Sequence, residues 1–385
     1  MDRYYTGRKG FSLIEMMIAM SVGLIVLGGA VQIYSSSVNA TWTVSQRALL
    51  QQDARAAYNL LAQDIGMAGA GIPTGGVPLA SGTATPPKYG CDVASGTCHL
   101  GSANSFSYGF PPQSGSPSIN QLYGVVPGCT QGPTINAAAG ATDTITVAYT
   151  DANFPLSNYQ VEFMDANGNG VQFIRTNATD TAVNNPGVGL KKGDLVLFQY
   201  LTTYAAVEVT DDLGSGPSPY VVPFASGDLL LMNQNAATSG GLKQLIAACV
   251  AKNVCTVATP PPAPPDKNAR AVTATRLYII TYYIDKTSGT PRLMRLANGL
   301  QPVPVADNVQ DLQFTYAAYD DVTGVLQGAP SCNAGGVSPN LIRNINITHL
   351  SIRSQGRNPR GYQGIDMQGT ISARNLSFEE RYGAQ

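Results

Sequence analysis

The stretch that decides the fold is Arg8-Lys9-Gly10-Phe11-Ser12-Leu13-Ile14-Glu15, together with the apolar run that continues from it to Tyr34. Between Met16 and Val31 this run contains no charged residue. A helix crosses the hydrocarbon core of a bilayer with about 20 apolar residues, so the segment 11–34 is long enough to span it. We therefore expect a transmembrane helix at this position.

Glu15 is the one charged residue inside that segment. A charged side chain at mid-membrane costs about 2.5–3.5 kcal/mol, so an acid here is a candidate functional residue. A secretory signal would have a shorter apolar region followed by a small-residue cleavage site, and no such site follows promptly. A plain membrane anchor stays open as an alternative, because Glu15 lies only about 7–8 Å along a helix from Gly10 and could reach the headgroups.

The residues before the apolar run indicate its orientation. Arg3, Arg8 and Lys9 outnumber Asp2 in this short leader. Positively charged flanks stay on the cytoplasmic side of a membrane. We therefore expect the N-terminus in the cytoplasm and the remainder of the chain outside it.

The segment Gly10-Phe11-Ser12-Leu13-Ile14-Glu15, behind a basic leader and ahead of a hydrophobic helix, resembles the class III signal of type IV prepilins. The resemblance implies that a membrane aspartyl peptidase, the prepilin peptidase, cuts after Gly10. It implies that Phe11 is then the N-methylated first residue. It also implies that Glu15 pairs with the terminal amine of a neighbouring subunit during assembly.

Elementary electrostatics supports that pairing. Cleavage after Gly10 would create a positive amine on Phe11, and we expect Phe11 and Glu15 at positions i and i+4 of one helix face. Both charges are costly in lipid unless they are paired. A bundle of laterally packed helices would give each charge a partner.

The helix is expected to continue beyond the membrane with a different residue pattern. Apolar residues recur there at steps of three and four, with polar residues such as Asp53 and Asp64 between them, which is typical of a half-buried amphipathic helix. Glycines and Pro73 then end it. The apolar positions are Leu50, Ala54, Ala57, Leu61, Ile65 and Ala68.

Composition and strand patterns predict what the helix packs on. Charged residues are only 12%, the net charge is −1, and the chain has 41 Gly and 25 Pro. No basic face is available for nucleic acid, and this composition suits an exported β-rich protein with long loops. Residues 70–140 look irregular, and β-branched and aromatic runs follow. The expected strands are 143–150, 171–175, 194–201, 205–209, 276–284, 292–296, 309–316, 342–353 and 369–376.

The expected fold class is therefore α+β. A long N-terminal helix, transmembrane in its first half and amphipathic in its second, packs on a β-rich, loop-rich, pilin-like globular domain. We divide the chain into a leader peptide at 1–10, a pilin helix at 11–69 and a periplasmic or extracellular head at 70–385.

Six cysteines lie in the part expected outside the cytoplasm, where disulfides form. Many pairings are possible, and the sequence alone does not fix one. Cys91 with Cys98 and Cys249 with Cys255 would close short loops, leaving Cys129 with Cys332. Metal binding is the competing interpretation, but there is no C-x-x-C and the chain has only two histidines, His99 and His349.

One segment partly matches a calcium-binding loop. Asp165, Asn167 and Asn169 stand in the spacing D-x-N-x-N-G, but Thr176 occupies the position of the bidentate glutamate. Asn-Gly between two β runs is also the strongest hairpin signal. We favour a hairpin turn and keep a calcium site as the weaker alternative.

Motifs of catalysis and of cofactor binding are missing. The sequence has no G-x-S-x-G, H-E-x-x-H, G-x-x-x-x-G-K or G-x-G-x-x-G. We therefore expect a protein that is not an enzyme and has no cofactor.

Four further segments resemble the PilW branch of minor pilins. They cover the helix end and the last third of the chain, and they are looser than the N-terminal signal. No such resemblance is found between about 70 and 270. The four segments are 64–69, 308–316, 345–353 and 368–376.

The resemblance implies a structural minor pilin of a type IV pilus that helps initiate assembly, in a tip complex, and supports twitching motility and adhesion. Its expected partners are the prepilin peptidase, other minor pilins, the major pilin, the inner-membrane assembly platform and a large tip adhesin. It would reside in the inner membrane before assembly, then in the periplasm and the surface pilus. Two alternatives stay open: a capping pseudopilin of type II secretion, and a membrane-tethered adhesin that does not polymerise.

Overall fold

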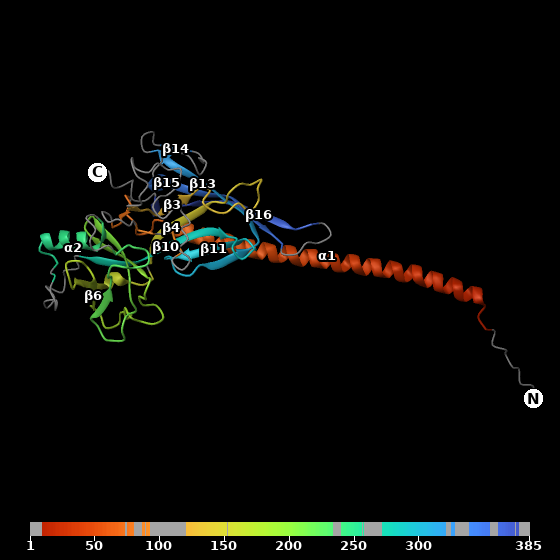
Figure 1. Cartoon of the computed structure of the whole chain (residues 1–385), viewed down its shortest axis with the longest axis horizontal. Coiled ribbons are helices and arrows are strands. Elements are labelled where there is room, and N and C mark those ends of the chain that lie inside the picture. Colours follow the sequence, from red (N-terminus) through yellow and green to blue (C-terminus); the bar gives the residue numbers. More distant parts are fainter. Residues whose placement is uncertain are drawn as a thin grey trace, which may run out of the picture.

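The computed structural model describes residues 10–73, 75–80, 87–88, 90–92, 121–151, 153–233, 240–255, 257, 272–320, 325–327, 339–354, 361–373 and 375–376. One long helix, α1 (Leu13–Met67, 55 residues), projects from a β-rich head. Its N-terminal part extends far from the rest of the molecule (Figure 1). The expected α+β class, a long apolar helix followed by a β-rich domain, is confirmed.

The two halves of α1 have different surroundings. In the part of the chain that the structure describes, α1 is the one helix long and apolar enough to cross a membrane. The large apolar side chains from Leu13 to Tyr34 are exposed in the isolated chain. Residues 35–46 are uncharged and mostly exposed. The buried residues begin at Leu50, and the apolar positions expected from the sequence are the ones that face the head.

Two antiparallel sheets form the body of the head. The larger has the order β12-β11-β10-β4-β3, with β7 and β8 joined to it through β10. Its strands are β3 (Val125–Gly128), β4 (Thr144–Asp151), β7 (Leu195–Tyr200), β8 (Thr203–Glu208), β10 (Thr273–Asp285), β11 (Arg292–Ala297) and β12 (Val303–Asp307). The second has the order β14-β13-β15-β16, with β13 (Val309–Asp320), β14 (Val325–Gln327), β15 (Ile342–Arg353) and β16 (Gly364–Ser372).

The main hydrophobic core lies where α1 meets these sheets. It joins Ala57, Leu61 and Ile65 of the helix to buried residues of β4, β10, β13 and β15, such as Ile280 and Phe314. Side chains packed this way each contribute about 1.5–3 kcal/mol relative to exposure. The docked half of α1 is therefore held by tertiary packing.

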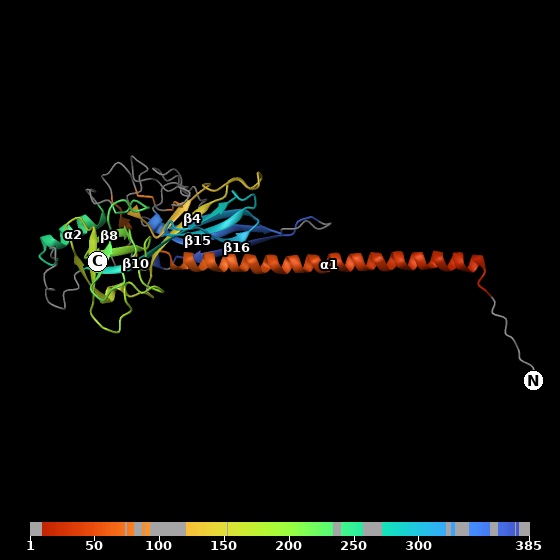
Figure 2. The same ribbon diagram turned by 60° about the horizontal axis from the view of Figure 1, so that its bottom comes forward.

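The helix and β16 lie side by side and run in the same direction (Figures 1 and 2). Arg47 Nε donates to Gln363 Oε1 at 2.8 Å, before the strand begins. Farther along, Gly369 faces Tyr58 so closely that an added Cβ would overlap the tyrosine hydroxyl. Beyond the strand, Asn375 Nδ2 lies 3.4 Å from the carbonyl of Gly66. Gly369 therefore permits the close approach of helix and strand.

A distal lobe, defined as the described residues from 153 to 257, lies at the end of the head remote from the free end of α1 (Figure 1). It contains a sheet of order β5-β6-β9 and the helix α2 (Gly241–Ala251), together with β7 and β8. Its strands are β5 (Tyr159–Phe163), β6 (Gly170–Arg175) and β9 (Tyr220–Pro223). Its core is rich in aromatic side chains, among them Phe173 and Phe198.

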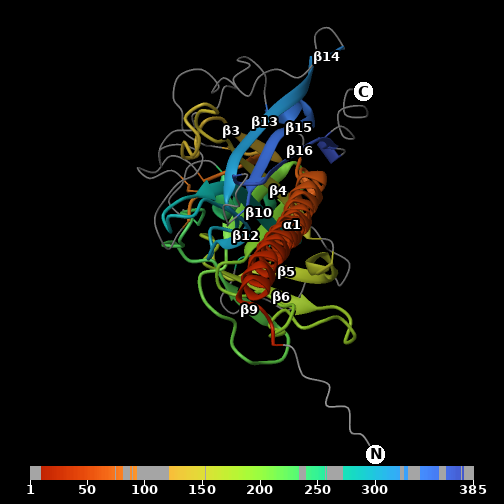
Figure 3. The same cartoon turned by 90° about the vertical axis from the view of Figure 1, so that its right-hand side faces the viewer.

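Strand β10 links this lobe to the two-sheet body of the head. Its first residues, Thr273–Leu277, pair with β7, and its later residues, Arg276–Tyr282, pair with β4. The remaining elements are short: β1 (Val77–Pro78) pairs with β2 (Gln121–Leu122), and two 3-10 turns occupy Leu156–Asn158 and Pro339–Leu341. Seen from the free end of α1 (Figure 3), the helix lies in front of the sheets of the head.

Several sequence expectations need correction. Helix α2 and strands β1, β2, β3, β5, β9, β12 and β14 were not expected. Most are short, and β9 and β12 contain proline, so local propensity is weak and pairing with neighbours determines them. The strand expected at 369–376 is instead Gly364–Ser372. Ala373 N donates the last hydrogen bond to β15, to Arg343 O, and the next described residues, 375–376, are helical.

Candidate processing and assembly site

The expected cleavage bond, between Gly10 and Phe11, lies in an exposed segment outside the helix. Gly10 and Phe11 precede the helix and are exposed, Phe11 to 88%. No atom lies within 4 Å of a Cβ built on Gly10, so this glycine is not required by packing within the chain. Exposed non-helical segments are the ones that proteases reach. The geometry is therefore compatible with cutting after Gly10.

Ser12 and Glu15 form a capping box at the start of α1. Ser12 has extended dihedrals, φ −76° and ψ 151°, and is the N-cap. The Glu15 N–H donates to Ser12 Oγ at 3.2 Å, and the Ser12 N–H donates to Glu15 Oε2 at 3.1 Å. Such a box satisfies two backbone donors that the helix leaves unpaired, and a carboxylate is favoured at the positive end of the helix dipole.

The capping box corrects one sequence expectation. We expected Phe11 and Glu15 on one helix face, but Phe11 lies before the N-cap and outside the helix. The signal was the pattern Ser12-x-x-Glu15 itself, which is the signature of a capping box. Cleavage after Gly10 would leave both members of the box in the chain. Glu15 can then cap its own helix and still accept a bond from another group, because a carboxylate has about four acceptor sites.

Asp64 is a second acid that the sequence analysis placed among polar positions, and the structure buries it. The residue is 4% exposed. Tyr282 Oη donates to its Oδ2 at 2.6 Å, and Tyr149 Oη donates to its Oδ1 at 3.1 Å. Arg295 Nε donates to Oδ2 at 2.7 Å. The cluster joins α1 to β4, β10 and β11, so it fixes the docked half of the helix on the larger sheet.

The electrostatics of this cluster follow from burial. Burial and then the adjacent Asp64 carboxylate raise the pKa of Tyr282 and of Tyr149, which keeps both hydroxyls protonated as donors. The pKa of Arg295 is lowered by burial but raised more by Asp64, so its net shift is upward. Removing one partner of such a buried pair leaves the other uncompensated, at a cost of about 3–5 kcal/mol. Periodicity alone could not reveal this, since the partners lie far away in sequence.

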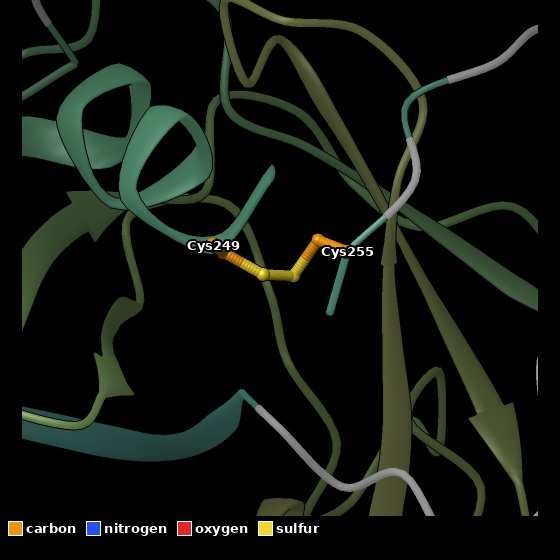
Figure 4. The surroundings of a disulfide bond; sticks show 2 residues. All are labelled: Cys249 and Cys255. Atoms are coloured by element: carbon orange, nitrogen blue, oxygen red, sulfur yellow. A yellow bond between two sulfur atoms is a disulfide. The ribbon is translucent and has the colours of Figure 1, made fainter. Parts of the chain in front are cut away.

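The cysteines are placed in part. Cys249, in α2, and Cys255, just beyond it, form a disulfide across six residues (Figure 4). This is one of the pairs that the sequence favoured. Cys91 and Cys129 each take part in a disulfide as well. Cys98 and Cys332 lie outside the described residues, so their pairing with Cys91 and Cys129 stays a prediction.

The segment weighed as a calcium loop forms the turn between β5 and β6. Asp165 Oδ1 accepts the backbone N–H of Asn167 at 2.8 Å and that of Asn169 at 3.2 Å. Strands β5 and β6 pair on either side of it, as the hairpin interpretation expects. The Asp165 carboxylate is thus engaged in turn hydrogen bonds. Within the described ranges no cluster of three or more His, Cys, Asp or Glu suited to a metal is found.

A buried acid pair in the distal lobe was also missed. Glu208, at the end of β8, accepts the N–H of Leu230 at 2.9 Å, and Asp228 accepts that of Met232 at 2.6 Å. Burial raises the pKa of Glu208 to about 7 and also raises the pKa of Asp228. Because two carboxylates in contact cannot both ionise cheaply, the pair shares a proton near neutrality.

Comparison with known proteins identifies a family motif at the N-terminus. The family model of the prokaryotic N-terminal methylation motif matches residues 6–31. No curated protein and no solved structure matches the chain.

This motif is a type IV pilin-like leader, and it covers the cleavage bond, the capping box and the apolar half of α1. The N-terminal segment is thus similar to a type IV pilin-like leader, which implies processing by prepilin peptidase and assembly with other pilins. Among the described helices, α1 is the one long and apolar enough to cross a membrane, and it fits an anchor in the inner membrane.

Proposed function

We propose that the chain is a minor pilin of a type IV pilus, of the PilW type, and that it acts as a structural subunit without catalytic activity. The observation that carries this proposal is the methylation motif at 6–31, with an accessible Gly10 and a lone acid just inside an apolar helix. The leader would hold the N-terminus in the cytoplasm while the head folds in the periplasm. Cleavage then frees the helix to leave the bilayer for the filament.

The size of the head supports a position at the pilus tip. The distal lobe adds a third sheet and α2 to a body that already contains two sheets. A head of this bulk would be hard to repeat along a shaft of tightly packed helices. We therefore place the chain with other minor pilins in a complex on which the assembly platform adds major pilin. A large tip adhesin would bind there, and twitching motility and adhesion would depend on it.

The segments that resemble PilW lie close together in the fold. Three of the four overlap strands β13, β15 and β16, which are neighbours in one sheet. The fourth is the end of α1, whose Ile65 packs in the same core. The four segments, far apart in sequence, thus form one connected body around the docked helix.

The experiment compares three variants that separate charge from capping. Glu15→Gln keeps a side-chain acceptor for the capping box but removes the charge, whereas Ser12→Ala removes the cap and keeps the charge. Glu15→Ala removes the charge and the carboxylate half of the capping box, whereas the Ser12 hydroxyl can still accept the backbone N–H of residue 15. Mass spectrometry of the mature N-terminus and the amount of chain in sheared pili are measured for each.

If charge pairing drives assembly, all three variants are cut after Gly10, and Glu15→Gln is lost from pili as completely as Glu15→Ala. Ser12→Ala should then stay close to wild type. Normal incorporation of Glu15→Gln would contradict the pairing role.

The same preparations test the alternatives. Because the family match covers only the N-terminal motif, a type II secretion pseudopilin is also compatible with it. Loss of secreted proteins, with normal pili, on deletion would favour the pseudopilin. An uncleaved leader would favour a membrane-tethered adhesin.

A further inference from the structure

The sheet edges of the head differ in how they are protected. Unpaired edge strands invite pairing with other chains, and proteins protect them with proline, short length or a cover. In the described part of the chain, β3, β9 and β12 contain proline. Strands β1, β2 and β14 have three residues or fewer, β5 is bridged to Val257 at Phe163, and β8 is largely buried beside α2.

Strand β16 is long and free of proline; α1 packs on one of its faces, but no described strand pairs with its outer edge. It is nine residues long, contains no proline or lysine, and pairs only with β15 among the described strands. Its side chains alternate regularly between half-buried and exposed. The half-buried ones, Ile365, Met367 and Ile371, pack against the main core.

The ladder with β15 shows which backbone groups of β16 face outward. Ala373 N donates to Arg343 O, and Ser354 N donates to Gln363 O. In an antiparallel ladder, alternate residues bond to one neighbour and the residues between them point their N–H and C=O to the other side. The odd-numbered residues of β16 therefore bond to β15. The outward groups belong to Gly364, Asp366, Gln368, Thr370 and Ser372.

A second copy of this chain does not fit that edge in an antiparallel register. Helix α1 and β16 run in the same direction, from Arg47 beside Gln363 to Gly66 beside Asn375. Antiparallel pairing of two β16 strands would therefore make the two α1 helices antiparallel. Two chains inserted in one membrane with the same orientation cannot adopt that arrangement.

We propose that the outer edge of β16 is a docking site for an extended strand of a different polypeptide, which adds to the β14-β13-β15-β16 sheet. Main-chain hydrogen bonds would give the affinity, and alternate side chains the specificity. On the outer face, Asp311, Ser351 and Asp366 stand in one cross-strand row, in which Asp366 also contacts His349 Nδ1 at 2.9 Å and Asp311 accepts from Gln313 Nε2. A partner with lysine or arginine in that row and apolar residues on the α1 side would complement it.

This surface is independent of the N-terminal site, so its test needs no pilus. The full chain in nanodiscs is mixed with a synthetic peptide of residues 342–353, the sequence that pairs with the inner edge of β16. The control peptide carries proline in place of Ile345 and Ile347 and so lacks two donors. Hydrogen–deuterium exchange of residues 364–372 is followed by mass spectrometry.

Two variants at one position isolate the edge. Gln368→Pro removes one outward N–H without touching the ladder to β15, since proline is tolerated where a strand N–H faces solvent. Gln368→Ala removes the same side chain and keeps the N–H. Unchanged exchange in 342–353 verifies that both variants are folded.

We expect the peptide to slow exchange of 364–372 by about tenfold or more in wild type and Gln368→Ala, and not in Gln368→Pro. The proline-bearing peptide should have no effect. Equal exchange with and without peptide, or equal protection of the two variants, would overturn the proposal. Self-association of the chain that Gln368→Pro abolishes would overturn the choice of a different polypeptide and indicate a second copy.

Discussion

The free half and the docked half of α1 belong to one continuous helix, yet different forces hold them. From Leu13 to Tyr34 no residue of the helix is buried against the described part of the head, and the order of this half depends on backbone hydrogen bonds, the Ser12–Glu15 cap and a surrounding apolar medium. From Leu50 to Ile65 it is fixed by buried apolar residues and by Asp64. Local sequence is therefore sufficient for the first half, whereas the second depends on residues far away.

The largest effect should come from the free half. Gly10→Val should nearly abolish processing, because a β-branched residue blocks close approach to the backbone, while leaving the head as stable as wild type. The stability part follows from the empty space around Gly10. Immunoblots would show the chain at its unprocessed mass, and thermal unfolding would be unchanged. A normally processed variant would contradict the assignment of the bond.

In the docked half, Asp64→Ala should destabilise the head by about 3–5 kcal/mol, because Arg295 and two tyrosine hydroxyls lose their shared acceptor. Asp53→Ala, an exposed position on the same helix, is the matched control and should stay within about 0.5 kcal/mol of wild type. Denaturant unfolding measures both. Equal effects would show that α1 docks through apolar packing alone.

The contact of the docked half with β16 can be sharpened by a double substitution. Gly369→Ala should cost about 1–3 kcal/mol, because the new methyl group overlaps the Tyr58 hydroxyl. Tyr58→Phe removes that hydroxyl, so the double variant should recover part of the loss, while the ring carbon Cζ still lies 2.9 Å from the new methyl group. A cost that Tyr58→Phe leaves unchanged would place the strain elsewhere.

An effect of similar size should involve neither half of the helix. Burial raises the pKa of Glu208 to about 7 from the ordinary value of 4.5. A carboxyl whose pKa is higher in the folded state binds more protons there, so stability should be highest below about pH 4.5 and fall by about 1–3 kcal/mol as the pH rises to 7.

Glu208→Gln should flatten that dependence and leave the effect of Asp64→Ala unchanged, because the acid pair is remote from α1. Unfolding curves at several pH values measure it. A slope that persists in Glu208→Gln would assign the titration to another group, such as Asp143, whose pKa is also raised by burial.

The same division, between local signals and contacts with distant residues, decides how much of the structure the sequence could predict. The apolar run, the position of Glu15 and the periodicity from Leu50 to Ala68 are local patterns, and they predicted α1 and its buried face. Long β-branched runs such as β10 and β15 were likewise predicted close to their observed bounds. Local signals failed where pairing decides, as in β9 and β12, and where partners are distant, as for Asp64 and the Glu208–Asp228 pair. The Ser12-x-x-Glu15 pattern is also a local signal. It predicts the capping box, which the expected Phe11–Glu15 helix face did not include.

The absence of charge between Glu15 and Arg47 makes movement of α1 through the membrane asymmetric. The uncharged residues 35–46 extend for about 18 Å of helix. The helix could therefore move toward the cytoplasm by up to that distance before Arg47 would enter the lipid. Outward travel brings Glu15 into the hydrocarbon at once, at a cost of a few kcal/mol, of order the mid-membrane value for an acid. In a chain anchored by α1, the spacing of Glu15 and Arg47 would therefore oppose outward movement of the helix until Glu15 is neutralised.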